Sequence, residues 1–177
     1  MKFLHYILLA FMVMSAPVWS TPALANGQGA YRDGEYPKAF DAFLPLANNG
    51  DAESQYYIGL MYAKGQAVPQ DAVTAVDWYQ KAADQGHPIA QNNLGYMYGQ
   101  GVGVKRSFVQ AHMWYSLAAA AGNILSQENR TLISKKMTSR QITRSQKLAR
   151  EWMTKFKGAT TQGSNTQGPS TQGPDTA

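Results

Sequence analysis

The sequence predicts an all-α fold: an α/α solenoid of helix-turn-helix repeats, closed by a C-terminal pair of capping helices. The first observation is a pattern that occurs twice, in residues 51–86 and 87–122, with a period of 36 residues, and a fixed period of this length is typical of stacked repeats. The clearest repeated positions are Gly59 and Gly95, Trp78 and Trp114, Gly86 and Gly122. The second observation is apolar residues at helical spacing within each unit. The third is the absence of cysteine from 177 residues, so no disulfide is available and the fold must be stabilised by packing alone.

Residues 1–25 have the features of a secretory signal peptide. Lys2 and His5 precede an apolar run over residues 6–13, and Ala23-Leu24-Ala25 matches a small-x-small cleavage site. The run is shorter than the roughly 20 apolar residues that a spanning helix needs, and no later stretch is apolar enough. We therefore expect cleavage after Ala25 and a periplasmic or secreted mature chain without a membrane span. The alternative is an uncleaved membrane anchor.

Residues 26–50 contain a degenerate half-repeat, because Gly50 lies one period before Gly86. A short first helix is expected over residues 26–33 and a second over 36–48. Pro45 lies inside the second helix and is expected to interrupt and kink it, since proline cannot donate the intrahelical hydrogen bond.

Residues 51–86 form the first complete unit. Ser54, Ile58, Met61 and Tyr62 share one face of its first helix, at spacings of three and four. Asp71 is suited to cap the second helix through its carboxylate, and Ser107 occupies this place in the second unit, residues 87–122. The second helix continues to about residue 84, and its apolar stripe consists of Ala75, Trp78, Tyr79, Ala82 and Ala83. At this spacing the aromatic residues are interpreted as core.

Gly59 and Gly95 lie inside the first helices of the two units. A glycine in a helix interior costs about 1 kcal/mol relative to alanine. Its repetition at the same place indicates a compensating gain, and we predict that a neighbouring helix approaches closely there.

Residues 123–157 form the predicted capping region. A helix is expected over residues 126–137, and Thr138 with Gln141 reads as a capping box for the last helix. The inner face of that helix consists of Ile142, Leu148, Ala149, Trp152 and Phe156. Residues 158–177 repeat Thr-Gln-Gly every five residues without a large apolar side chain, which predicts disorder.

Charge is uneven along the chain, whose net charge is +5. Residues 26–122 contain six basic and eight acidic side chains, whereas residues 123–157 contain nine basic and two acidic ones. A basic end on a nearly neutral body is compatible with contact to anionic polymers or membrane surfaces, but a solvated helix face is the favoured interpretation. No aromatic stacking platform accompanies the basic residues, so a nucleic-acid partner is not expected.

The 36-residue unit resembles the Sel1-like repeat, a TPR-like family, in its bacterial exported type. The matching residues of the first unit are Ala52, Ile58-Gly59, Tyr62, Gly65, Val68, Asp71, Ala75, Trp78-Tyr79, Lys81-Ala82-Ala83 and Gly86. The second unit departs from the pattern at Lys105, Arg106 and Ser107. The resemblance implies an α/α solenoid that serves as a protein-interaction scaffold, and exported bacterial members look like adaptors at the cell envelope.

The sequence offers no set of residues for catalysis. His87 and His112 are the only histidines after the predicted cleavage site, and they occupy non-equivalent repeat positions without cysteine nearby. A metal site needs three or four converging ligands, and no phosphate loop or nucleophile with a partner base is present. We therefore expect no catalytic residues, cofactor or metal, and a cell-wall hydrolase is the least favoured function.

Two sets of residues are candidates for partner binding. Tyr56, Leu60, Asn92 and Tyr96 are expected to turn away from the core stripe of the first helices, toward the surface that is generally concave in a solenoid. The basic candidates of the last helix are Arg140, Arg144, Lys147 and Arg150. The favoured function is a non-catalytic scaffold that binds a peptide or protein in this groove. The alternative is binding of an anionic polymer or lipid surface, for example peptidoglycan, through the last helix.

Overall fold

The computed structural model describes the backbone of residues 22–164 and the side chains of residues 22–157. Within this range the chain forms α-helices and no strand, which confirms the predicted all-α class. The helices are α1 (Pro22–Arg32), α2 (Tyr36–Asn48), α3 (Ala52–Lys64), α4 (Ala72–Asp84), α5 (Pro88–Gln100), α6 (Phe108–Ala120), α7 (Ile124–Ser134) and α8 (Ser139–Ser164).

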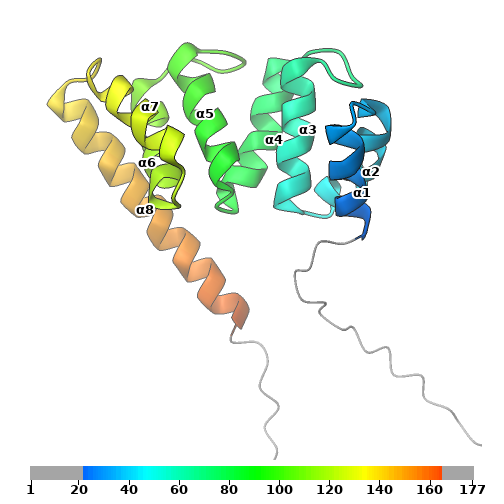
Figure 1. The fold of residues 1–177 in the computed structure, drawn as a ribbon. Coiled ribbons are helices and arrows are strands. Elements are labelled where there is room, and N and C mark those ends of the chain that lie inside the picture. The colour runs from blue at the N-terminus through cyan, green and yellow to red at the C-terminus, as the bar shows by residue number, and fades with distance from the viewer. Residues whose placement is uncertain (1–21, 165–177) are drawn as a thin grey trace, which may run out of the picture.

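The helices pack as successive antiparallel pairs, the arrangement of a solenoid (Figure 1). The first helices of the units, α1, α3, α5 and α7, lie side by side and are here called the first-helix row. The second helices α2, α4 and α6 lie behind this row in Figure 1. The long helix α8 packs on α6 and runs obliquely, so that its C-terminal part extends below the lower ends of the other helices in Figure 1. Helices α1 to α7 therefore contact mainly their neighbours in the chain, whereas α8 contacts mainly α6.

The predicted helix caps are present. Asp71 Oδ1 accepts hydrogen bonds from the backbone N–H groups of Val73 and Thr74, and Ser107 Oγ accepts from Gln110 N. These bonds satisfy backbone N–H groups in the first turn of α4 and α6, which have no acceptor within their own helix.

The capping box of α8 is confirmed. Thr138 N donates to Gln141 Oε1 over 2.8 Å, and Gln141 N donates to Thr138 Oγ1 over 3.3 Å. We expected the helix before this box to end at residue 137, but α7 already ends at Ser134. The capping box begins the next helix four residues later, at Thr138.

The close approach at the repeated glycines is confirmed. A Cβ atom on Gly59 would lie 2.8 Å from Cδ1 of Tyr79, and one on Gly95 would lie 2.6 Å from Cδ1 of Tyr115. Both tyrosines are buried on the second helix of the same unit. Each glycine therefore provides the space for an aromatic ring of the core.

The predicted apolar stripe of α4 is mostly buried. Ala75, Tyr79, Ala82 and Ala83 lie in the central core cluster, with Trp114 of the next unit. Trp78 is only partly buried, and the Nζ atom of Lys81 lies 3.8 Å from its ring centroid, as in a cation–π contact.

Some expected boundaries differ from the structure. Helix α1 begins at Pro22, four residues before the expected start, and Leu24 packs against the first core cluster. Helix α2 continues through Pro45 to Asn48 without interruption. Pro45 removes one hydrogen bond in the last turn, and its own carbonyl still accepts from Asn49 N. That single loss does not end the helix.

At the other end, α8 continues to Ser164, into the stretch that we expected to be disordered. Extending an existing helix by one residue costs far less than starting a new one, so the polar residues after 158 prolong α8. Residues 1–21, with most of the predicted signal peptide, and residues 165–177 lie outside the described residues.

Candidate functional site

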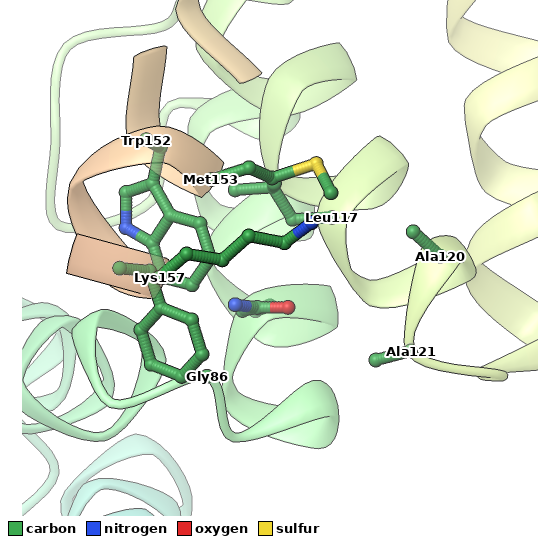
Figure 2. Close-up of a pocket in the computed structure, with 9 residues that line it drawn as sticks. Gly86, Leu117, Ala120, Ala121, Trp152, Met153 and Lys157 are labelled. Atoms are coloured by element: carbon green, nitrogen blue, oxygen red, sulfur yellow. The ribbon is translucent and has the colours of Figure 1, made fainter. Parts of the chain in front are cut away.

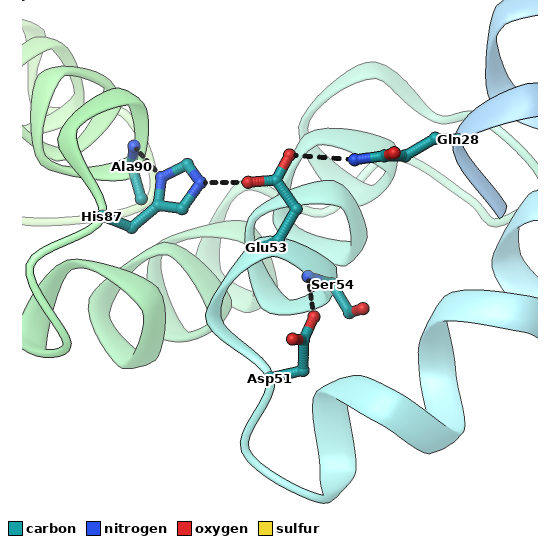
Figure 3. Close-up of polar contacts among 6 residues, drawn as sticks. All are labelled: Gln28, Asp51, Glu53, Ser54, His87 and Ala90. Atoms are coloured by element: carbon teal, nitrogen blue, oxygen red, sulfur yellow. Dashed lines mark hydrogen bonds and ion pairs between the residues drawn. The ribbon is translucent and has the colours of Figure 1, made fainter. Parts of the chain in front are cut away.

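Polar contacts join the first three helices of the first-helix row (Figure 3). The Nε2 atom of His87 lies 2.9 Å from Glu53 Oε2, and Gln28 Nε2 donates to Glu53 Oε1 over 3.4 Å. His87 is also the N-cap of α5, because its Nδ1 accepts from Ala90 N over 3.1 Å. The ring proton must then be on Nε2, which donates to the carboxylate. This hydrogen bond is the main cause that lowers the pKa of Glu53 below its ordinary value.

A second polar contact joins α5 and α7. Asn92 Oδ1 accepts from Ser126 Oγ over 2.9 Å and from Asn129 Nδ2 over 3.2 Å. Asn92 is 8% exposed. Our expectation of an exposed Asn92 is therefore wrong: its amide joins two helices of the row.

Tyr56 and Leu60 also lie against neighbouring helices. The Tyr56 ring stacks on His87 with a centroid distance of 4.9 Å, and burial raises the pKa of Tyr56 to about 12. Leu60 is partly buried against the central core cluster. A helical wheel of α3 alone cannot show this burial, because residues outside α3 provide it. Tyr96, by contrast, is exposed as expected.

Four of the exposed apolar side chains of the row occupy two repeat positions, and Ile124 of α7, which is 76% exposed, occupies a third. Ile89 and Tyr96 lie seven residues apart on α5, hence on one face, and are 46% and 54% exposed. One period later, Leu125 and Leu132 on α7 are 56% and 58% exposed. We call these four residues the apolar stripe. A hollow of about 430 Å³ adjoins it, lined by Leu132 and by other residues of α7.

Sequence reasoning missed three residues of the apolar stripe. The repeat period contains the signal that finds Leu132, since Leu60, Tyr96 and Leu132 are successive counterparts. The pattern weakens after residue 122, which concealed this equivalence.

The basic candidates of α8 separate into two places. Arg140, Arg144 and Lys147 are exposed at spacings of four and three, and Lys147 Nζ lies 3.8 Å from the Glu151 carboxylate. Arg150 instead lines a hollow of about 400 Å³.

His112 and Arg130 line that same hollow beside Arg150. His112 is buried, with Nδ1 at 2.9 Å from Ser145 Oγ. Burial, and secondarily the charge of Arg130, lowers the pKa of His112. The two cationic side chains therefore lie beside an imidazole that favours its neutral form.

Neither a metal-binding cluster nor a membrane-spanning helix is found in the described part of the chain. Within residues 22–157, His, Asp and Glu side chains form no group of three that could hold a metal ion. None of the described helices combines the length and the apolar character that crossing a bilayer requires.

Comparison with known proteins agrees with this geometry. The family model described as Sel1 repeat matches residues 52–87, 88–123 and 137–156. A protective antigen present in uropathogenic Escherichia coli strains, which displays an SLR fold, superimposes with a TM-score of 0.72 at 31% identity over 86% of this chain. A Sel1 repeat protein from Oxalobacter formigenes gives a TM-score of 0.60 at 30% identity over 63% of this chain.

The match covers only part of these two proteins. This chain spans 35% of the E. coli structure and 46% of the O. formigenes structure. No curated protein has significant sequence similarity to the chain. The three matched repeats and the solenoid of helix pairs lead to one conclusion. The chain belongs to the Sel1 repeat family, whose members generally act as non-catalytic scaffolds for protein–protein interaction.

Proposed function

We propose that this chain is a non-catalytic scaffold of the bacterial cell envelope that binds a peptide or protein partner on its first-helix row. The observation that supports this most directly is the apolar stripe of Ile89, Tyr96, Leu125 and Leu132. Exposed apolar residues that gather on one face, rather than singly, are typical of interaction sites. Aromatic residues such as Tyr96 frequently supply most of the binding energy.

The polar contacts along the first-helix row favour this role. Glu53 with His87, and Asn92 with Ser126, hold α3, α5 and α7 in fixed relation. A partner that docks on a preorganised surface loses less conformational entropy on binding.

Site-specific photo-crosslinking in the native cell tests the surface. A photoreactive residue replaces Tyr96 in one variant and Val73 in the other. Val73 is a matched control, because it is 59% exposed but lies on the second helix α4. We expect a discrete crosslinked partner from position 96 only, and its loss when Leu132→Ala is added. Equal crosslinking from both positions would contradict the proposal.

Envelope location is part of the proposal and rests on the signal-peptide features of residues 1–25. Cell fractionation with N-terminal sequencing of the mature chain tests it. We expect an envelope fraction that begins at Asn26. A cytosolic protein that retains Met1 or Lys2 would disprove export.

Binding of an anionic polymer is the second candidate function. The exposed Arg140, Arg144 and Lys147 favour it, as do Arg130 and Arg150 beside their shared hollow. Cosedimentation with purified peptidoglycan tests it, with Arg140→Gln/Arg144→Gln/Lys147→Gln as the variant. Binding should weaken sharply between low and moderate ionic strength. Salt-independent binding, or full binding by the variant, would exclude this mode.

A further inference from the structure

Gln55 and Gln91 are counterparts in the two units, and the amide nitrogens of their side chains make equivalent hydrogen bonds. Gln55 Nε2 donates to the Ala47 carbonyl over 3.0 Å, and Gln91 Nε2 donates to the Ala83 carbonyl over 3.1 Å. Each bond reaches back to the end of the preceding second helix.

The two glutamines differ at their oxygen atoms. Gln55 Oε1 accepts from Gln85 Nε2 over 2.8 Å. No donor from the described residues reaches Gln91 Oε1, although Gln91 is only 1% exposed. A buried acceptor without a donor destabilises a protein interior, so this oxygen is suited to accept a hydrogen bond from a bound partner.

The sequence explains why Gln91 Oε1 has no donor. The counterpart of Gln85 is Ala121, one period later, and both residues have the same backbone conformation (φ −87°, ψ 4° and φ −84°, ψ 9°). Lys81 and Asp84 are likewise replaced by Leu117 and Ala120. The second unit has thus exchanged three polar side chains for apolar ones around Gln91.

These replacements line a cavity of about 230 Å³ between α5, α6 and α8 (Figure 2). Gln91 and the three replaced positions form one side. Trp152, Met153 and Phe156 of α8 form the other. The lining is almost wholly apolar, and Gln91 is the buried polar side chain within it.

We propose that this cavity binds a partner polypeptide, which inserts one large apolar side chain and donates a backbone N–H to Gln91 Oε1. The volume is below the roughly 300–1,000 Å³ of small-molecule sites and suits a single leucyl or phenylalanyl side chain. The chain's own residues 165–177 contain no apolar side chain larger than proline, so they cannot fill it.

Charge indicates the composition of the segment that enters. The part of α8 that forms one wall lies within residues 150–157, which contain three Arg or Lys residues and one acidic residue, Glu151. Acidic residues beside the apolar anchor are therefore complementary to this wall. The inference rests on the proposed scaffold function only in that the ligand is a polypeptide, since the cavity shares no residue with the apolar stripe.

Titration of the full chain with the capped peptide Ac-Asp-Glu-Phe-Glu-Asp-NH₂, followed by NMR, tests the proposal. Two analogues isolate the contacts: one replaces Phe by Ala, and one replaces the Phe N–H by an ester oxygen. We expect saturable shifts at α5, α6 and α8, and binding weakened at least about tenfold by either change.

Two protein variants provide the matched comparison. Ala121→Gln supplies the donor that Gln85 provides in the first unit, so it should raise the melting temperature and weaken the peptide at least about tenfold. Gln85→Ala should lower the melting temperature and leave peptide binding unchanged. Tyr96→Ala/Leu132→Ala should also leave it unchanged, which separates this site from the proposed groove.

Three results would overturn the proposal. The first is an absence of binding at millimolar peptide. The second is equal affinity of the amide and the ester, or of wild type and Ala121→Gln, which would leave a bound water as the partner of Gln91. The third is a dimer in sedimentation that Ala121→Gln dissociates, which would make a second copy of the chain the occupant.

Discussion

A missing side chain sets the distance between the two helices of each pair. Gly59 faces Tyr79 and Gly95 faces Tyr115, and the first pair uses the same device with Gly27 against Phe43, where a Cβ would lie 2.6 Å from the ring. The glycines lower helix propensity, and the buried aromatic rings offset that loss through packing.

Gly95→Ala is expected to lower the free energy of unfolding by about 1 kcal/mol. Overpacking against Tyr115 costs about 1–3 kcal/mol, and the higher helix propensity of alanine offsets about 1 kcal/mol of that cost. Gly99→Ala on the same helix is the control. Its Cβ would lie 3.6 Å from Ala111 Cβ, an ordinary contact, so it should gain up to about 1 kcal/mol. Urea unfolding measures both. Equal effects would contradict the packing account.

Asn92→Ala is expected to cost about 1–3 kcal/mol, because it removes the acceptor of the Asn129 amide. Ser126 Oγ, by contrast, still has Asn123 Oδ1 as an acceptor. Tyr96→Ala, on the exposed side of the same helix, should stay within about 0.5 kcal/mol. Thermal unfolding of both variants measures the difference. If Asn92→Ala were as neutral as Tyr96→Ala, the amide would have no structural role.

At the scale of elements, two kinds of contact hold the solenoid. Within a pair, apolar faces meet around the tyrosine rings. Along the first-helix row, side-chain hydrogen bonds join α1 to α3, α3 to α5 and α5 to α7. The bonds from α1 to α3 and from α3 to α5 both end on the Glu53 carboxylate, so these two depend on its charge.

The pKa of Glu53 lies below its ordinary value of 4.5 in the folded chain. The folded state therefore binds fewer protons than the unfolded state in acid, and the stabilisation present above pH 4.5 is lost as the pH falls through the lowered pKa. We expect wild type to be more stable than Glu53→Gln at pH 7 and the difference to shrink below about pH 4.5.

Thermal unfolding of both proteins between pH 3 and pH 7 measures this difference. His112, whose lowered pKa also reduces stability in acid, is present in both wild type and Glu53→Gln. Its contribution therefore cancels in the difference between the two proteins. A difference that did not change with pH would show that Glu53 acts without its charge.

At the scale of the whole molecule, stability depends on contacts between neighbours. Helix α8 covers the end of the stack: its Trp152 ring meets Trp114 at 6.2 Å between centroids and stacks on Phe156 at 4.8 Å. Repeats of this kind open from an end more readily than from the middle.

Trp152→Ala is expected to cost about 3 kcal/mol, by the loss of a large packed ring. Hydrogen exchange should show faster exchange in α6, α7 and α8, with little change in α1 and α2, because α8 packs mainly on α6. Uniform loss of protection along the chain would show a single cooperative unit instead.

The repeat period predicted most of the architecture. It placed α2, the caps Asp71 and Ser107, and the close approach at Gly59 and Gly95, because these depend on residues near one another in the sequence. It failed at Pro45 and at the end of α8, where a locally unfavourable residue is tolerated within an established helix.

The sequence by itself determined the class of fold, the order of the helices and the family. Only the tertiary structure decided which surface residues are free. Asn92 and Tyr56 are covered by helices from the next unit, whereas Leu125 and Leu132 remain exposed. Gln91 lost its donor through a change at Ala121, 30 residues away in the chain. The physical reason is that helix periodicity is local, whereas burial and hydrogen-bond satisfaction depend on the helices that pack alongside.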